Sequence, residues 1–310
     1  MKITLLDAKT LGDDLDLAPL RELGEFVSYD TTRADETLDR IKDSDIIITN
    51  KVVITAKMMA EAPKLKLICI SATGMNNVDL DEAKKRDIEV KNVAGYSTAS
   101  VVQHTFSMAL YLLEKMAYYD SVVKSGEWSR SGLFTDVSRP FGEIGSMRWG
   151  IIGMGAIGRG VASVASSFGA EVVYYSTSGT NLSQEYTHYS LDNLLAKCDI
   201  ISIHSPLNKQ TLNLINSTNL KLLRDNTILL NLGRGGIINE EDLAKEIDAR
   251  EIFVGLDVLS KEPLESESPL ALVKSQERLL ITPHIAWTSI EARRKLLDGV
   301  VDNIKSFKSQ

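Results

Sequence analysis

The sequence predicts an α/β protein built on parallel sheets, and three observations support that class. Short apolar runs alternate with amphipathic segments through the first 90 residues, the alternation starts again at Arg148, and a glycine-rich turn follows the first strand of this second series. Strands that alternate with helices are typical of βαβ units, in which successive strands run parallel.

The first series contains short apolar runs that we expect to form buried strands. These runs cover residues 3–6, 26–29, 46–49, 65–70 and 88–90. Between them, residues 34–42 and 55–62 have apolar side chains at helical spacing. A long helical pattern follows from residue 98 to about residue 125, and a Gly- and Ser-rich stretch over residues 125–146 is expected to be a loop.

The second series repeats the alternation with different residues. We expect strands at residues 149–152, 171–175, 200–204, 227–231, 253–255 and 279–282, and helices at residues 157–168, 191–197, 240–248 and 289–306. The last helix could pack on either half of the chain, and the pattern alone leaves both arrangements open.

Composition narrows the class of function. The chain has 310 residues, of which 44% are hydrophobic and 25% charged, as in ordinary globular proteins. The net charge is 35 − 42 = −7, which argues against general binding to nucleic acid or to an anionic membrane surface. Cys69 and Cys198 lie in apolar runs and are expected to be reduced core residues. Because the His, Cys and carboxylate residues show no metal-ligand spacing, we predict no metal.

The start of the chain and its apolar runs bear on location. Met1 leads directly into a strand-like segment, without the pattern of a signal peptide, and the apolar runs are too short to span a bilayer. The cytoplasm is therefore the expected compartment.

A G-x-G-x-x-G sequence follows the first strand of the second series. It comprises Gly153, Met154, Gly155, Ala156, Ile157 and Gly158. In a dinucleotide site the first Gly permits a tight turn, the second lets the backbone approach a pyrophosphate, and the third lets the helix pack on the strand. A tight turn without a ligand is the alternative, but the strand before and the helix after favour a cofactor site.

The next strand bears on the choice of cofactor. An acidic residue at its end usually binds the ribose of NAD, but here Ser176 and Thr177 occupy the tip. Their hydroxyls could bind a ribose or a 2′-phosphate, and no adjacent Arg secures NADP. The sequence therefore leaves NAD, NADP or both as expected cofactors.

Further along the chain, expected strands are followed by three residues with chemically useful side chains, Arg234, Glu262 and His284. Arg can bind a carboxylate and polarise a carbonyl oxygen, His can exchange a proton near neutral pH, and Glu can orient that His. Taken singly, each has an ordinary structural reading, as a surface Arg, a hydrogen-bonding His or a solvated Glu. Together they predict reduction of a 2-keto acid by a nicotinamide cofactor.

With these residues in view, the chain resembles the D-isomer-specific 2-hydroxyacid dehydrogenase family. The residues in its motifs are most similar to those of the glycerate dehydrogenase (hydroxypyruvate reductase) branch. The matching motifs occur in the family's order and include SATGMNNVD from Ser71, NVAGYST from Asn92, CDIISIHSPL from Cys198, NLGRG from Asn231 and TPHIAW from Thr282.

This resemblance implies two Rossmann-like or flavodoxin-like doubly wound domains with the active site in the cleft between them. Residues 1–99 and 287–310 would form the substrate domain, and residues 100–286 the NAD(P)-binding domain. Family members are usually homodimers, and the long helix with loop 98–148 would form the contact.

The resemblance also implies a set of site residues. Arg234, Glu262 and His284 would be catalytic. Besides the glycine loop with Ser176 and Thr177, the cofactor would contact His204, Ser205, Pro206, Leu232, Gly233 and Asp257, the last through the nicotinamide carboxamide. The substrate would contact Lys51, Ala72, Thr73, Gly74, Tyr96 and Trp287, with Lys51 and Tyr96 at its far end and the small residues 72–74 binding its carboxylate through backbone N–H groups.

The expected function is thus NAD(P)-dependent interconversion of a small 2-keto acid, such as hydroxypyruvate or glyoxylate, and its D-2-hydroxy acid. Two alternatives remain at this point. One is a non-enzymatic, dinucleotide-sensing corepressor-like binding protein of the same architecture. The other is a phosphoglycerate dehydrogenase that lacks a regulatory domain.

Overall fold

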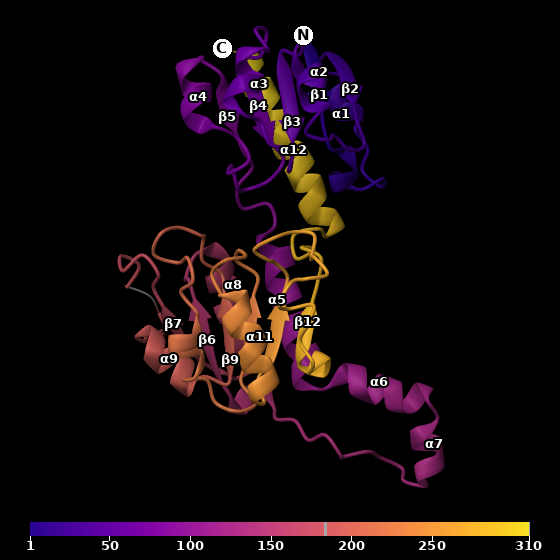
Figure 1. The fold of residues 1–310 in the computed structure, drawn as a ribbon, viewed down its shortest axis with the longest axis vertical. Helices are drawn as coiled ribbons and strands as arrows, with labels where there is room; N and C mark the ends of the chain where they lie inside the picture. Colours follow the sequence, from indigo (N-terminus) through magenta and orange to yellow (C-terminus); the bar gives the residue numbers. More distant parts are fainter. Residues whose placement is uncertain (183–184, 310) are drawn as a thin grey trace. The chain divides into compact units, whose positions relative to one another are not determined.

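The computed structural model describes residues 1–182 and 185–309, and these residues form two compact units (Figure 1). The N-terminal unit comprises Met1–Ser97 together with Thr288–Gln310, and the central unit comprises Thr98–Trp287. The assignment of one unit to the substrate and of the other to the cofactor stays a prediction.

The described residues of the N-terminal unit contain a parallel sheet of five strands in the order β2-β1-β3-β4-β5. The strands are β1 (Lys2–Leu5), β2 (Glu25–Ser28), β3 (Ile46–Thr49), β4 (Leu67–Ile70) and β5 (Glu89–Lys91). Since β2 lies on one side of β1 and β3 on the other, the strand order reverses between β1 and β3. Such a reversal is the usual ligand position in doubly wound sheets.

Helices cover this sheet, and the last one returns from the far end of the chain. They are α1 (Ala18–Arg21), α2 (Thr37–Ile41), α3 (Ala56–Ala60), α4 (Leu80–Lys85) and α12 (Ile290–Lys308), with a short 3₁₀ turn η1 (Ala8–Leu11). The helix α12, yellow in Figure 1, packs against β4. It also closely approaches the segment after β5, where a Cβ on Gly299 would lie 2.6 Å from the Val93 side chain. The final helix therefore belongs to the N-terminal unit.

The described residues of the central unit form a parallel sheet of seven strands in the order β12-β11-β10-β9-β6-β7-β8. The strands are β6 (Arg148–Ile152), β7 (Glu171–Tyr175), β8 (Thr187–His188), β9 (Ile200–Ile203), β10 (Ile228–Asn231), β11 (Phe253–Leu256) and β12 (Leu279–Ile281). The order reverses between β6 and β9, directly beside the glycine-rich turn. This is the Rossmann strand order with an added strand.

Neighbouring residues on the central strands point to opposite faces and build two cores. Ile151 packs in one hydrophobic cluster and Ile152 in the other, as the alternation of side chains along a strand requires. The first core includes Trp149, whose Nε1 donates to Ser202 Oγ at 2.9 Å. The helices are α5 (Thr98–Leu113), α8 (Ala156–Ser167), α9 (Leu191–Lys197), α10 (Ser217–Leu220) and α11 (Glu240–Ala249), with 3₁₀ turns η2 (Ile144–Ser146) and η3 (Gln276–Arg278).

The expected helix from residue 98 to about residue 125 is interrupted. The helix α5 ends at Leu113, and Lys115 adopts the left-handed conformation, with φ 54°, before α6 (Met116–Lys124) begins. A left-handed residue ends an α-helix because it breaks the i to i−4 hydrogen-bond ladder. Here the Lys115 ammonium lies over the Phe253 ring, 3.1 Å from its centroid, a tertiary contact that helical periodicity does not reveal.

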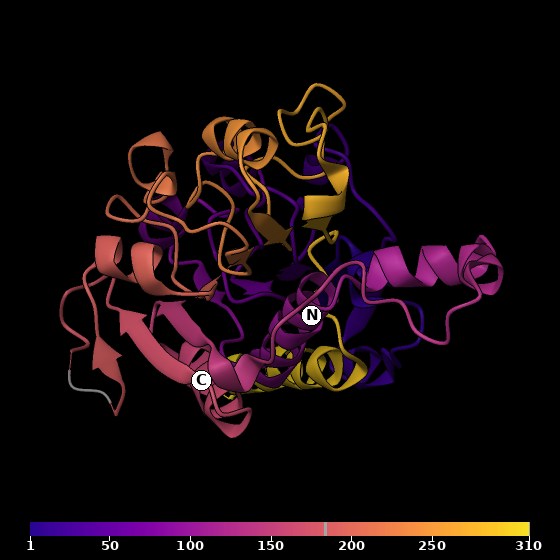
Figure 2. The same ribbon diagram turned by 90° about the horizontal axis from the view of Figure 1, so that it is seen from below.

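The stretch after α6 contains a further helix, α7 (Glu127–Ser131), inside the region expected to be a loop. Figures 1 and 2 show α6, α7 and the returning chain extending away from the sheet of their own unit. Apolar side chains are exposed along this arm, with 91% of Phe134, 77% of Val137 and 67% of Leu133 accessible. None of the helices in the described ranges has the length and apolar character needed to cross a membrane.

Candidate active site

The three glycines of the G-x-G-x-x-G turn have distinct geometries. Gly153 has φ 96°, and a Cβ there would lie 2.8 Å from the backbone N of Ser205. A Cβ on Gly158 would overlap the carbonyl oxygen of Gly153. A Cβ on Gly155, by contrast, would have no atom of the described residues within 4 Å, its local backbone aside. The outer glycines thus allow the turn and the packing, while the middle one leaves space beside the backbone.

The helix α8 begins immediately after this turn. Ala156 and Ile157 form its first turn and Gly155 is its N-cap residue, without a side chain to accept from the first N–H groups. Free N–H groups and the helix dipole at this end favour an anion such as a pyrophosphate.

Buried polar atoms lacking protein partners gather on the strands beside the turn. Ser176 follows β7, while His204 and Ser205 follow β9. Within the described ranges, Ser176 Oγ, Ser205 Oγ and both ring nitrogens of His204 are buried and find no hydrogen-bond partner. Burial lowers the pKa of His204 from 6.5 to about 3, so its ring is neutral at physiological pH. Buried polar groups in native proteins are normally paired, so these atoms fit a site that a polar ligand completes.

The chemical groups of these residues, as well as their positions beside the turn, fit a dinucleotide. The open backbone at Gly155 suits a pyrophosphate, and a hydroxyl at Ser176 suits a ribose, as the sequence predicts. Pro206 and Thr177 are neighbours of these polar residues in sequence, and Leu232 and Gly233 follow the adjacent strand β10. Their contacts with a cofactor stay predictions.

The turn that carries Arg234 is fixed by a side chain of the preceding strand. Asn231 Nδ2 donates to the carbonyl of Arg234 at 2.9 Å, and Asn231 Oδ1 accepts from the N–H of Gly233 at 3.1 Å. A Cβ on Gly235 would overlap the carbonyl of Leu259, so the turn packs closely on the segment that leads to Glu262. Sequence reasoning missed this role of Asn231.

His284 and Glu262 form a hydrogen-bonded pair. The Nδ1 of His284 lies 2.8 Å from Glu262 Oε2, with 24% and 33% of the two side chains exposed. Glu262 Oε1 accepts from the N–H of Leu259 at 3.0 Å, which orients the carboxylate. With Nδ1 donating to Glu262, the Nε2 atom is left for exchange with a substrate.

The backbone at His284 adopts an unusual conformation that neighbouring groups stabilise. Its φ is 55°, in the left-handed region that residues other than Gly rarely occupy. The buried carboxylate of Asp257 accepts from the N–H groups of Ile285 at 2.8 Å and Ala286 at 2.9 Å. It also accepts from Thr282 Oγ1 at 2.6 Å. Asp257 therefore braces the segment that presents His284, and its expected contact with a nicotinamide carboxamide stays a prediction.

Two residues of α5 reach the same segment. His104 Nε2 lies 3.1 Å from Thr282 Oγ1, and Ser100 Oγ donates to the carbonyl of Ala286 at 2.6 Å. Neither of these two contacts was predicted from the sequence. A helix more than 170 residues away in the chain supplies these contacts, so no local pattern could have indicated them.

The expected substrate residues divide between the units. Trp287 lies in the central unit, whereas Lys51, Ala72, Thr73, Gly74 and Tyr96 lie in the N-terminal unit. Lys51 follows β3, and residues 72–74 follow β4, at the carboxyl ends of neighbouring strands. Asn92 Nδ2 donates to the carbonyl of Thr73 at 2.6 Å, which fixes the small-residue loop to the segment after β5.

Comparisons with known proteins agree with this architecture. A family model described as "D-isomer specific 2-hydroxyacid dehydrogenase, NAD binding domain" matches residues 106–286. A hydroxypyruvate reductase of Blautia hydrogenotrophica is 35% identical over 99% of this chain and 97% of its own length.

Solved structures give the same result. An acyclic imino acid reductase in complex with NADPH and D-Arg superposes with a TM-score of 0.86 at 28% identity, covering 100% of this chain and 98% of that one. A D-lactate dehydrogenase of Aquifex aeolicus complexed with NAD and lactic acid gives a TM-score of 0.84 at 25% identity, covering 100% and 96%. The chain therefore belongs to the D-isomer-specific 2-hydroxyacid dehydrogenase family, which confirms the expected family, α/β fold and enzyme class.

Proposed function

We propose that the enzyme reduces a short 2-keto acid, with hydroxypyruvate and glyoxylate as the first candidates, and oxidises the matching D-2-hydroxy acid in reverse. The observation that carries the proposal is the His284–Glu262 pair, whose Nδ1 and Oε2 atoms lie 2.8 Å apart. Asp257 braces the segment after His284, and the Arg234 turn packs on the segment that leads to Glu262. The hydroxypyruvate reductase from Blautia supports the choice of substrate.

The proposed roles follow from the chemistry of each side chain. The Arg234 guanidinium binds the substrate carboxylate and draws electron density from the keto oxygen. A reduced nicotinamide, when bound, supplies the hydride that the keto carbon accepts. His284 Nε2 donates a proton to the keto oxygen, and in the reverse direction it removes the proton of the alcohol. Glu262 keeps the imidazole oriented.

The N-terminal unit supplies the remaining substrate contacts in this proposal. Backbone N–H groups of Ala72, Thr73 and Gly74 bind the carboxylate, while Lys51 and Tyr96 border the opposite end of the substrate. Trp287 of the central unit shapes the wall.

A direct assay tests this function. Purified protein is mixed with hydroxypyruvate, glyoxylate or another short 2-keto acid and either NADH or NADPH, and nicotinamide absorbance is followed. We expect turnover with at least one pair and formation of the D-hydroxy acid. If every combination stays at the level of an Arg234→Ala control, the proposed function is wrong.

For the cofactor, we propose that the enzyme can use NADP or both nucleotides. The supporting feature is Ser176 at the end of β7, where a carboxylate would repel a 2′-phosphate. The comparison of kcat/KM for NADPH and NADH decides between the two, and a strong preference for NADH would contradict the proposal.

We also propose that the protein is a homodimer formed through α5 and the arm over residues 98–148. The arm exposes Phe134, Val137 and Leu133, and monomers rarely leave such apolar side chains together in solvent. Light scattering of wild type and Phe134→Asp tests the contact. We expect wild type to be a dimer and Phe134→Asp to dissociate more readily, whereas a monomeric wild type would contradict the proposed dimer. The cytoplasm stays the predicted compartment.

A further inference from the structure

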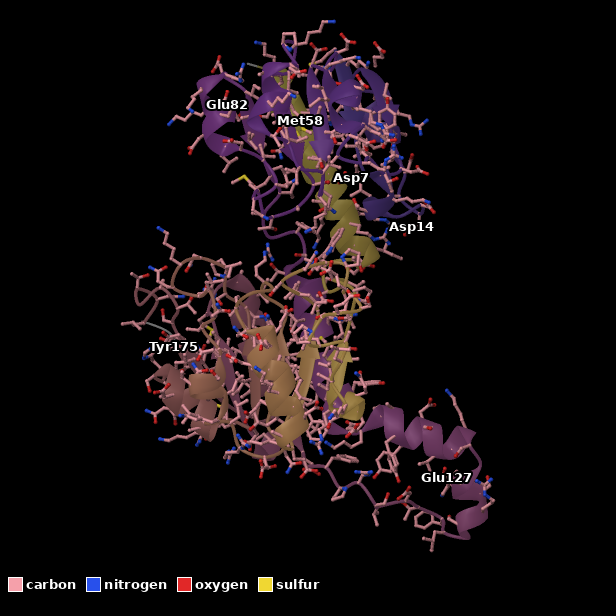
Figure 3. The ribbon with its side chains drawn as sticks, in the orientation of Figure 1. Asp7, Asp14, Met58, Glu82, Glu127 and Tyr175 are labelled. Atoms are coloured by element: carbon pink, nitrogen blue, oxygen red, sulfur yellow. The ribbon has the colours of Figure 1, made fainter. Side chains whose placement is uncertain are left out.

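A buried carboxylate lies at the point where the strand order of the N-terminal sheet reverses. Asp7, labelled in Figure 3, comes two residues after the end of β1, and its residue is only 4% exposed. The adjacent strand across the reversal is β3, which leads into Asn50, Lys51 and Val52. Asp7 thus occupies the place where doubly wound sheets commonly bind a ligand.

Asp7 accepts hydrogen bonds from three successive backbone N–H groups. The N–H of Asn50 lies 3.0 and 2.9 Å from its two oxygens, and the N–H groups of Lys51 and Val52 lie 2.8 and 3.4 Å from Oδ2. Thr49 Oγ1 donates to the same oxygen at 3.2 Å. Successive N–H groups that converge on an anion form a nest, and here the anion is part of the chain.

The same loop is held from its other side by Asn77. The Nδ2 of Asn77 donates to the carbonyl of Val52 at 3.0 Å and lies 3.5 Å from the carbonyl of Asn50. Asn77 follows the small-residue loop 72–74 in sequence. Asp7 therefore fixes the N–H groups of Asn50 and Val52, on either side of Lys51. Asn77 fixes the carbonyls of the same two residues, and it belongs to the segment that continues from the proposed carboxylate loop.

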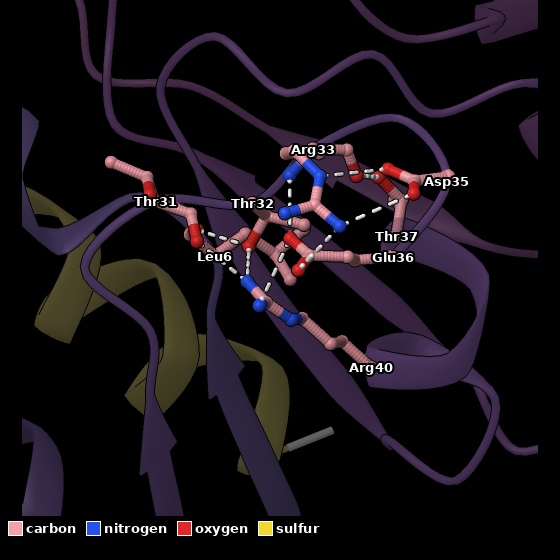
Figure 4. Close-up of polar contacts among 8 residues, drawn as sticks. All are labelled: Leu6, Thr31, Thr32, Arg33, Asp35, Glu36, Thr37 and Arg40. Carbon is pink, nitrogen blue, oxygen red and sulfur yellow. Dashed lines mark hydrogen bonds and ion pairs between the residues drawn. The ribbon is translucent and has the colours of Figure 1, made fainter.

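Asp7 is itself held in position. The N–H of Ala8 donates to the carbonyl of Tyr29 at 2.9 Å, and Thr32 Oγ1 donates to the carbonyl of Leu6 at 2.5 Å. Figure 4 shows how Arg40 secures Thr32, with Nη1 2.5 Å from the Thr32 hydroxyl and 2.6 Å from the carbonyl of Thr31. The residues before and after Asp7 are thus tied to the loop that follows β2.

We propose that Asp7 is a positioning residue that sets the substrate specificity of the enzyme by holding the Lys51 loop. This inference rests on the proposed function, in which Lys51 borders the end of the substrate remote from the carboxylate. Hydroxypyruvate carries a hydroxymethyl group at that end, whereas glyoxylate carries only hydrogen. Correct placement of Lys51 therefore matters for the longer substrate and little for the shorter one.

Asp7→Asn is the sharpest variant because it keeps the size of the side chain. One carboxylate oxygen becomes an NH₂ group, which cannot accept from the N–H groups that face it. We expect KM for hydroxypyruvate to rise about tenfold more than KM for glyoxylate, since a shift of this size corresponds to the loss of a good hydrogen bond. General damage to the enzyme would affect both substrates.

A double-mutant cycle with Lys51→Ala tests whether Asp7 acts through Lys51. If it does, Asp7→Asn adds nothing to the change in the KM ratio that Lys51→Ala causes alone, because the two residues form one unit. Additive effects would overturn the inference, as would equal increases in KM for both substrates.

Asp45→Asn is the matched control. Asp45 also accepts a hydrogen bond from a backbone N–H, that of Lys2 at 2.7 Å. It lies at the amino end of β1, whereas Asp7 lies beyond the carboxyl end of the same strand. We expect this variant to leave the ratio of the two KM values unchanged. Should Asp7→Asn fail to fold, Asn77→Ala removes the other side of the clamp and should change the ratio in the same direction.

Amide hydrogen exchange separates the failure of this inference from the failure of the proposed function. In Asp7→Asn the amides of residues 50–52 should exchange faster than in wild type, with or without activity. Unchanged exchange there would overturn the clamp. If the clamp is present but wild type turns over neither substrate, the proposed function is wrong and the role of Asp7 in specificity is wrong with it.

Discussion

The two sheets reverse their strand order in the same way and use the reversal differently. In the central unit the residue after β6 is Gly153, which Ser205 approaches closely. Among the described residues, no atom outside the local backbone lies within 4 Å of a Cβ on Gly155, and the buried hydroxyl of Ser205 has no partner. In the N-terminal unit, Asp7 comes two residues after β1 and fills the nest of N–H groups after β3. The same topology thus provides a place for an anion in both sheets, and the residues that follow the first strand differ between a glycine turn and a carboxylate of the chain.

The residues proposed for the reaction and those proposed for substrate choice lie in different units. The His284–Glu262 pair and the Arg234 turn lie in the central unit, and the Lys51 loop lies in the N-terminal unit. We therefore expect substitutions in the central unit to affect the rate of reaction and cofactor use. Substitutions in the N-terminal unit should affect the choice and affinity of the substrate.

The largest expected effect comes from His284→Ala. Removal of the proton donor should lower kcat between about a hundredfold and ten-thousandfold, the usual contribution of a general acid. Steady-state kinetics in both directions provide the measurement. Lys51→Ala is the counterpart in the other unit and should raise KM with a much smaller change in kcat. Similar kcat losses in both variants would remove the distinction between the units.

Gly155→Val tests whether the open reversal point receives the nucleotide. The φ of Gly155 is −79° and no protein atom lies near its Cβ position, so the fold should tolerate the side chain. A bound pyrophosphate would collide with it, and we expect nucleotide affinity to fall by more than about tenfold. Calorimetric titration and the melting temperature together give the result. Unchanged affinity would contradict a nucleotide at this turn.

Ser176→Asp tests whether residue 176 sets the preference between NADPH and NADH. A carboxylate there repels a 2′-phosphate and accepts from ribose hydroxyls, so the kcat/KM ratio of NADPH to NADH should fall by about tenfold or more. Ser178→Asp is the matched control, because its hydroxyl pairs with Thr180 Oγ1 at 2.9 Å and lies two residues further on. A similar fall in both variants would indicate a general charge effect.

His204 provides the smallest expected effect, on stability against pH. Its pKa is lowered to about 3 in the folded protein, against 6.5 for a free imidazole, so the unfolded chain gains a proton below pH 6.5 that the folded chain does not. The free energy of unfolding is therefore unaffected by His204 above pH 6.5. Below pH 6.5 it falls by at most about 1.4 kcal/mol per pH unit, because protonation of His204 favours the unfolded chain. Denaturant unfolding of His204→Gln should show a shallower acid loss. The exposed His188→Gln should resemble wild type, and parallel curves for all three proteins would refute the argument.

The sequence predicted the architecture because apolar runs and their spacing report burial directly. The strands around Gly153 and the pair of Glu262 and His284 follow from local patterns and from motif order. The break at Lys115 was not predicted, and the contact that its ammonium makes there is with a ring of β11 that is distant in the chain. The braces from Asp257, Ser100 and Asp7 were missed for the same reason: each joins side chains to backbone groups that only the folded sheet brings together.

The most direct test concerns the His284–Glu262 pair, and it uses kcat of Glu262→Ala and Glu262→Gln in both directions. Glu262 Oε2 lies 2.8 Å from Nδ1 of His284 and so orients the ring with Nε2 toward the substrate in the proposed mechanism. We expect kcat of Glu262→Ala to fall by at least about tenfold in both directions, and Glu262→Gln, whose amide oxygen can still accept from Nδ1, to keep more of its activity. If Glu262→Ala keeps the kcat of wild type, Glu262 does not support the proton donor and the central claim is wrong.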